Sequence, residues 1–139
     1  MATTEETLAT LRRIWDARKL GYEAKLSVKH DSAGLEIFAP GSNKSVVVYS
    51  PGDLWVSLDV PDGFSANYFE EGMTEEDLLI WLERYLDAGI AYLEGRFVLH
   101  RSRRLRIPHV VIETSTGPVR LDLGPKALIR AVVTRGRAQ

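Results

Sequence analysis

The sequence predicts an α+β fold: a mainly antiparallel β-meander sheet packed against a long central helix and an N-terminal helix. An amphipathic helical pattern opens the chain, and short alternating segments separated by turn residues follow through residues 22–70. A longer, more apolar helical pattern then covers residues 74–93. A chain of 139 residues fits a single domain, residues 1–139, large enough to bury a core without metals or disulfides.

The first element expected is a helix over residues 4–19. Thr3 and Glu6 have the spacing of a capping box, and apolar residues then recur every three or four positions. Gly21 is expected to be the left-handed residue that ends this helix. Trp15 is interpreted either as an exposed docking residue or as a core anchor, and the burial statistics of tryptophan favour the core.

An alternating pattern of apolar and polar residues replaces the helical one at residue 22. It predicts a strand over residues 22–29, a turn over residues 31–34, and a return strand from residue 35. Further strands are expected over residues 45–49, 54–60 and 66–70, because Gly, Pro, Asn and Asp supply turns between them. Such even spacing predicts an antiparallel meander of four or five strands, within a sheet of about six.

The fold is expected to be organised around the helix over residues 74–93. Thr74 can cap its N-terminus, and the acidic residues of the first turn suit the positive end of the helix dipole. A wide apolar stripe along this helix needs a sheet or a second helix to cover it. Gly89 either ends the helix or allows a close packing contact, whereas Gly95 is expected to end the helix if Gly89 does not.

Three shorter strands are expected after the central helix, over residues 96–99, 107–114 and 119–123. A basic connector, residues 101–106, joins the first two. From Gly124 onward the chain is expected to form a last helix, with Pro125 at its first position, or to bend into a final strand.

The net charge of −1 conceals a separation of charge along the chain. Residues 1–95 contain 8 Lys or Arg and 17 Asp or Glu, a net charge of −9, whereas residues 96–139 contain 10 and 2, a net charge of +8. The two halves either attract each other within the fold or present an acidic face and a basic face to different partners.

No catalytic signature stands out, so we expect a protein that is not an enzyme and that carries no cofactor. Without cysteine there is no thiol nucleophile and no thiolate metal site. His30, His100 and His109 lack the spacing of a helical zinc pair, so no metal site is expected. No apolar run approaches the roughly 20 residues of a membrane span, and no leader-like segment opens the chain, which favours a cytoplasmic location and no membrane partner.

Two segments are candidates for binding. The segment from Asp59 to Asp77 combines aromatic and acidic residues, which suits a docking surface for a basic protein, although these aromatic residues could equally cover the central helix. The residues predicted to form this surface are Asp59, Asp62, Phe64, Tyr68, Glu70 and Glu71. The alternative surface is a basic patch of clustered arginines that could contact phosphates. Its residues are Arg101, Arg103, Arg104 and Arg106, within the basic region 96–130.

Three short motifs carry a family resemblance. A first helix ending in Leu20-Gly21-Tyr22, a second containing Glu83-Arg84-Tyr85-Leu86, and an Arg-rich segment closing on Leu105-Arg106-Ile107-Pro108 follow one another around a meander. In this order of elements the chain resembles small bacterial immunity proteins, in particular the immunity factors that neutralise NAD-degrading necrotizing toxins. The resemblance implies a cytoplasmic, non-catalytic α+β protein that binds and blocks a cognate protein toxin.

The expected function is therefore that of an immunity or antitoxin-like inhibitor, with a protein toxin as its partner. Two alternatives remain open. One is a nucleic-acid-associated protein that uses the basic 96–130 region, and the other is a structural or assembly subunit of a larger particle.

Overall fold

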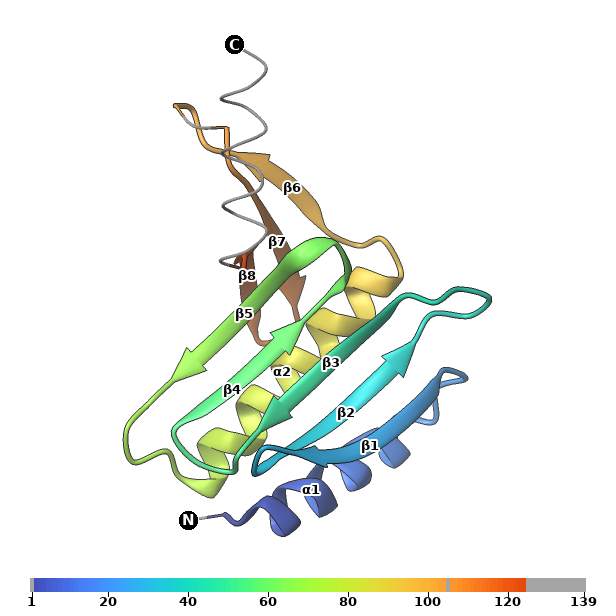
Figure 1. Ribbon diagram of the computed structural model, residues 1–139, viewed down its shortest axis with the longest axis vertical. Coiled ribbons are helices and arrows are strands. Elements are labelled where there is room, and N and C mark those ends of the chain that lie inside the picture. The colour runs from blue at the N-terminus through green and yellow to red at the C-terminus, as the bar shows by residue number, and fades with distance from the viewer. Residues whose placement is uncertain (1, 105, 125–139) are drawn as a thin grey trace.

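The computed structural model describes residues 2–104 and 106–124, which form two helices and one eight-stranded sheet (Figure 1). The helices are α1 (Thr4–Arg18) and α2 (Glu75–Leu93), and a short 3-10 turn, η1, covers Pro61–Gly63. The strands are β1 (Glu23–Lys29), β2 (Ser32–Phe38), β3 (Ser45–Ser50), β4 (Trp55–Asp59), β5 (Phe64–Phe69), β6 (Val98–Arg101), β7 (Pro108–Thr114) and β8 (Gly117–Leu123).

The sheet has the strand order β1-β2-β3-β4-β5-β8-β7-β6, and every neighbouring pair is antiparallel. The first five strands are the predicted meander. The last three strands extend the same sheet, because β8 pairs with β5 through Phe64–Leu123 and Ser65–Asp122. The α+β class is thus confirmed, with eight strands rather than about six.

The predicted capping of α1 is confirmed at its start and wrong at its end. The Thr3 side chain accepts a hydrogen bond from the Glu6 backbone N–H at 3.1 Å. At the other end, Lys19 rather than Gly21 takes the left-handed conformation, with φ of 50°. Trp15 is half-buried against the core, which agrees with the core-anchor interpretation.

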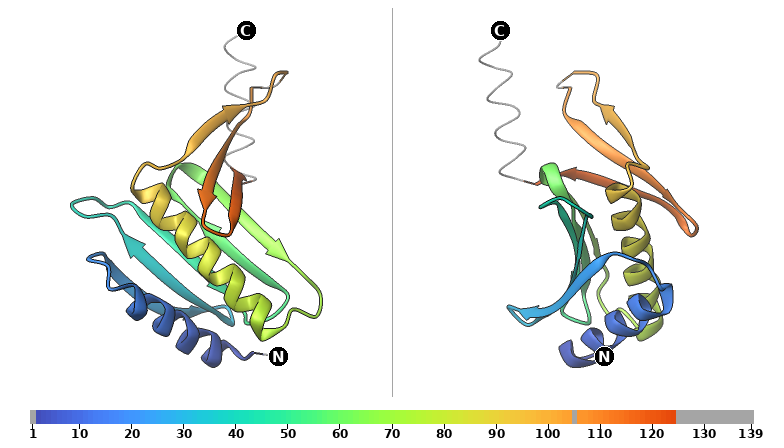
Figure 2. Two further views of the ribbon diagram at one scale, coloured as in Figure 1. Left: turned by 180° about the vertical axis from the view of Figure 1, so that it is seen from behind. Right: turned by 90° about the vertical axis from the view of Figure 1, so that its right-hand side faces the viewer.

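Helix α2 lies at the centre of the molecule, as its sequence predicts. Thr74 and Asp77 form a reciprocal capping box, and the helix continues through Gly89 to Leu93. Gly89 is a close packing contact: a Cβ atom there would lie 3.0 Å from Val46 Cγ2 and 3.3 Å from Leu58 Cδ1. The sheet curls around this helix, because α2 contacts β3 and β4 on one side and β7 and β8 on the other (Figure 2).

Helix α1 covers β1 and β2 on the same face of the sheet as α2. Alternation along the strands turns apolar side chains toward the helices, so that Leu35, Val48 and Leu58 are fully buried. The helices lie behind the meander in Figure 1, and the opposite face of strands β1–β5 carries no helix among the described residues.

The β1–β2 turn differs from its prediction. Its two central residues are His30 and Asp31, with φ of 50° and 61°, so Gly34 lies inside strand β2 rather than in a turn. The last helix or strand, predicted from Gly124 onward, lies outside the described residues. Within the described part of the chain, neither helix is long and apolar enough to cross a membrane.

Candidate functional site

The face of strands β1–β5 that points away from the helices is not covered by a helix among residues 2–104 and 106–124, and we call it the open face. Alternation places Gly34 and Glu36 of β2, and Val47 and Tyr49 of β3, on this face. The residues of β4 and β5 that share it are Trp55, Ser57, Asp59, Ser65, Asn67 and Phe69. One side of the sheet therefore builds the core, while the other presents polar and aromatic side chains.

Three aromatic residues gather on the open face. Tyr49 and Trp55 meet edge to face, with ring centroids 5.6 Å apart and an interplanar angle of 82°. Phe69 is the direct cross-strand partner of Trp55, and 65% of it is exposed. It is the most exposed large apolar residue of the described chain. Exposed aromatic rings next to half-buried ones are a common composition of protein-binding surfaces.

Hydrogen bonds fix the polar side chains around these rings. Ser45 donates to Glu36 Oε2 at 2.7 Å, and the Tyr49 hydroxyl donates to Asp59 Oδ2 at 3.1 Å. Burial raises the pKa of Tyr49, and the nearby Asp59 carboxylate raises it further. Partial desolvation also raises the pKa of Asp59. Hydrogen bonds within the open face thus hold the side chains of Glu36, Tyr49 and Asp59 in place.

A hollow of about 430 Å³ opens on this face beside the aromatic residues, and we call it the Gly34 hollow. Its lining includes Gly34 of β2, which is itself buried, and the aromatic pair Tyr49 and Trp55. The complete lining consists of Ser27, Lys29, His30, Ser32, Gly34, Glu36, Val47, Tyr49 and Trp55.

The predicted aromatic anchors do not lie on the open face. Phe64 is only 8% exposed and belongs to the core, and Tyr68 is half-buried with its ring stacked on Trp81 at 3.8 Å. Phe64 is therefore unavailable as a partner anchor, and the ring of Tyr68 packs on Trp81 of α2 instead of pointing out from the open face. Strand parity is the reason, because positions 64, 66 and 68 of β5 face the helices and position 69 faces outward.

The predicted acidic residues do not form one continuous patch either. Asp59 and Asp62 lie at the η1 end of the β4–β5 hairpin, where Asp62 accepts a hydrogen bond from the Tyr92 hydroxyl at 2.9 Å. Glu70 and Glu71 lie at the opposite end of β5, beside Phe69. Both residues follow Phe69 directly in the sequence, and the Glu70 carboxylate accepts a hydrogen bond from the Tyr68 hydroxyl at 3.0 Å, on the helix-facing side of β5. We call Trp55, Phe69, Glu70 and Glu71 the β4–β5 patch.

The four arginines of the alternative basic surface lie on one hairpin. Strands β6 and β7 form a hairpin that projects from the rest of the molecule, and its tip carries the arginines (Figure 1). Every one of the four predicted residues is exposed: Arg101, Arg103, Arg104 and Arg106. We call residues 98–109 the basic arm. Val98 and Leu99 on its edge strand are also exposed, at 57% and 48%.

The acidic and basic halves of the chain do not neutralise each other within the described residues. Glu70 and Glu71 precede α2 and the basic arm follows it, so a helix of 19 residues, about 28 Å long, separates them. Arg96 with Glu94, at 2.5 Å, is the one ion pair between the two halves among the described residues, and it is local. Glu70 and Glu71 thus lie at the opposite end of α2 from the basic arm, whereas Asp62 and Glu94 lie at the same end as the arm, where Asp62 contacts Tyr92 and Glu94 pairs with Arg96.

Two of the histidines meet on the basic arm. His100 and His109 are cross-strand partners, and their rings stack with centroids 5.1 Å apart. Asp122 is the next residue in register, opposite His109, but it pairs with Arg120 at 3.0 Å. No group of three His, Cys, Asp or Glu side chains is close enough to hold a metal ion in residues 2–104 and 106–124.

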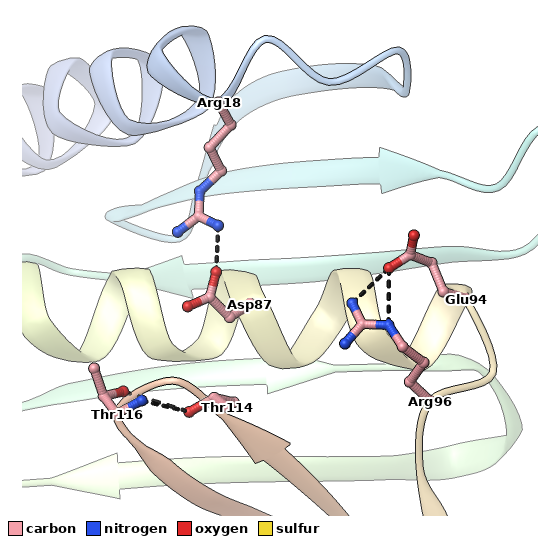
Figure 3. A network of polar contacts seen from close by, with 6 residues as sticks. All are labelled: Arg18, Asp87, Glu94, Arg96, Thr114 and Thr116. Carbon is pink, nitrogen blue, oxygen red and sulfur yellow. Dashed lines mark hydrogen bonds and ion pairs between the residues drawn. The ribbon is translucent and has the colours of Figure 1, made fainter.

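A second, charged hollow of about 360 Å³ lies between the two helices and the β7–β8 turn (Figure 3). Arg18 at the end of α1 pairs with Asp87 of α2, and Arg96 pairs with Glu94. The hydrogen bond from Arg96 lowers the pKa of Glu94. The Arg18–Asp87 pair ties α1 to α2, whereas the Arg96–Glu94 pair is local. Four of the five charged residues that line the hollow are therefore already paired, and Glu113 is the fifth.

Comparisons with family models, with curated proteins and with solved structures yield no match for this chain. The resemblance to immunity proteins therefore stays a prediction.

Sequence reasoning found the basic arm and missed both the Gly34 hollow and Phe69. The signal for Phe69 was present, since Phe64, Ala66 and Tyr68 share one parity and Phe69 has the other. The hollow had no such signal, because it depends on which strands pair with β2.

Proposed function

We propose that this chain is a non-catalytic, cytoplasmic binding protein of the immunity or antitoxin type, whose partner is a basic protein toxin that docks on the β4–β5 patch. The observation that carries the proposal is Phe69, an aromatic side chain 65% exposed on an ordered sheet face. Its cross-strand neighbour Trp55 supplies a second anchor, and Glu70 and Glu71, which follow Phe69 in the chain, supply negative charge at this end of β5. Aromatic anchors with charged residues at their rim are typical of protein interfaces.

The charge of the patch supports a basic partner. Carboxylates at the rim of an interface chiefly accelerate association and select the partner, whereas buried aromatic anchors slow dissociation. The residues next to the patch extend the negative charge, because Glu75, Glu76 and Asp77 occupy the first turn of α2. An active-site region rich in Lys or Arg on the toxin would complement this end of the molecule.

The test is binding of the protein encoded by the neighbouring reading frame. Surface plasmon resonance with purified proteins compares the wild type with Phe69→Ala and with the double variant Glu70→Lys/Glu71→Lys. Phe69→Ala is expected to weaken binding by about 30-fold, the effect of a hot-spot residue, mainly through faster dissociation. The charge variant is expected to slow association at low salt, because rim charges act through steering.

The matched controls are Phe97→Ala and Glu113→Lys, which alter an exposed aromatic ring and an exposed carboxylate away from the patch. Both are expected to bind as the wild type does. A complex whose rates are unaffected by both patch variants would remove the β4–β5 patch from the proposal. Absence of any complex with the neighbouring gene product would remove that toxin as the partner.

A second candidate function is nucleic-acid binding by the basic arm, and the clustering of four exposed arginines at one hairpin tip favours it. Fluorescence anisotropy with a labelled single-stranded oligonucleotide tests it across a salt series. Phosphate contacts by several arginines give a steep salt dependence, and each Arg→Ala substitution in the arm should reduce the slope of log K against log salt by about one. A lack of binding at low salt eliminates this candidate.

A further inference from the structure

Two local departures from ordinary strand and turn chemistry converge on the Gly34 hollow. The first is Gly34 itself, a glycine in the middle of β2. A Cβ atom there would meet Tyr49 Cβ at 3.6 Å, Ser27 Oγ at 3.7 Å and the Val48 carbonyl oxygen at 3.8 Å, all ordinary van der Waals contacts. Its φ is not in the left-handed region, so neither the backbone nor the packing requires a glycine. A glycine inside a strand weakens the strand and commonly marks close approach by a ligand or another backbone.

The second departure is the β1–β2 turn. His30 and Asp31 both have positive φ, the conformation in which a two-residue hairpin loop prefers Asn-Gly or Gly-Gly. His30 lines the hollow, whereas Asp31 does not. His30 and Asp31 thus occupy turn positions where glycine would be less strained, whereas position 34, where a side chain would fit, carries a glycine. Both choices keep the hollow open and put an imidazole at its rim.

The lining indicates what the hollow can hold. Tyr49 and Trp55 offer aromatic surface for a planar ring, and the absence of a side chain at Gly34 leaves space in the hollow for such a ring. Lys29 brings a positive charge to the β1–β2 end, and both Lys29 and His30 bring N–H donors. Glu36, the one carboxylate among the lining residues, already accepts a hydrogen bond from Ser45.

From this geometry we propose that the Gly34 hollow is a binding site for a small planar aromatic molecule that carries a carboxylate. The ring lies against Trp55 and Tyr49 above Gly34, and the carboxylate faces Lys29 and His30. The site goes beyond the proposed protein partner: it shares Trp55 with the β4–β5 patch, but Phe69, Glu70 and Glu71 are not part of its lining.

The experiment is a titration of the ¹⁵N-labelled full chain, followed by two-dimensional NMR, with indole-3-acetate and with tryptamine as probes. The two probes share the ring and differ in the sign of their charge. Indole-3-acetate is expected to shift the Gly34 amide and the Trp55 indole N–H signals, and to bind at least tenfold more tightly than tryptamine. Equal affinities would overturn the carboxylate assignment, and unchanged Gly34 and Trp55 signals would overturn the site.

Substitutions with matched controls separate loss of the site from loss of the fold. Gly34→Ala is expected to keep or raise Tm and to weaken the binding of indole-3-acetate at least tenfold. The control is Gly21→Ala, whose new Cβ atom has nothing within 4 Å, and it should leave this binding unchanged. His30→Gly and Asp31→Gly both relieve the turn and should raise Tm by about 3 °C. Only His30→Gly is expected to lose the preference for indole-3-acetate.

Phe69→Ala distinguishes this site from the proposed partner surface, because it should leave indole-3-acetate binding intact. Wild-type affinity for indole-3-acetate in Gly34→Ala would overturn the proposal.

Discussion

Gly89→Ala is the substitution that most sharply tests how α2 sits in the sheet. In an exposed helix interior this change stabilises a protein by about 1 kcal/mol, because alanine has the higher helix propensity. Here the new methyl group would lie 3.0 Å from Val46 Cγ2 and 3.3 Å from Leu58 Cδ1, both in fully buried side chains of the core. Overpacking of this kind costs about 1–3 kcal/mol. The expected net effect is a loss of about 1 kcal/mol, or about 3 °C in Tm.

Urea unfolding followed by circular dichroism measures this free energy, and Gly34→Ala is the matched control. Both glycines lie inside regular elements without positive φ, but alanine meets only ordinary contacts at position 34. The changes in the free energy of unfolding caused by the two substitutions should therefore have opposite signs or clearly different sizes. Stabilisation by Gly89→Ala of about 1 kcal/mol would refute the close contact between α2 and strands β3 and β4.

Three further predictions concern the helix cap, the aromatic packing and the pH dependence. Thr74→Ala removes the capping box and should lower the free energy of unfolding by about 1 kcal/mol in urea titrations, with an unchanged m-value. Trp81→Ala removes the ring that stacks on Tyr68 at 3.8 Å, and should lower the same quantity by about 2 kcal/mol. Burial raises the pKa of Tyr85 to about 12, from 10.0 for an ordinary tyrosine. The unfolded chain then loses its proton first as pH rises above 10, so stability should fall there, and Tyr85→Phe should flatten the fall; an identical pH profile in that variant would count against the burial of this hydroxyl.

Local signals in the sequence were sufficient for most of the elements. The capping boxes and periodicities gave both helices to within one residue at each end, because capping and amphipathicity act within a few residues. The exception is the end of α1, where Lys19 adopts the left-handed conformation that the sequence predicts for Gly21. Which residue becomes the C-cap depends on the direction that the chain takes into β1, and a local sequence pattern does not specify this direction.

The candidate site was less accessible to sequence reasoning, since it depends on strand parity and strand order. Choosing Phe64 and Tyr68 instead of Phe69 amounts to reading β5 on the wrong face, an error of one residue. Pairing of β8 with β5 joins segments more than 50 residues apart, and it leaves β6 at the sheet edge, where the arginines project. Such long-range pairing leaves no signature in the spacing of a single sequence.

Amide hydrogen exchange of the complex with the neighbouring gene product tests the central claim most directly, namely that the open face is the binding surface. Partner binding is expected to slow amide exchange in residues 54–59 and 65–71, around Trp55 and Phe69. The exchange rates in the basic arm should stay as they are in the free protein. Protection confined to residues 98–109, with unchanged exchange across β4 and β5, would contradict it.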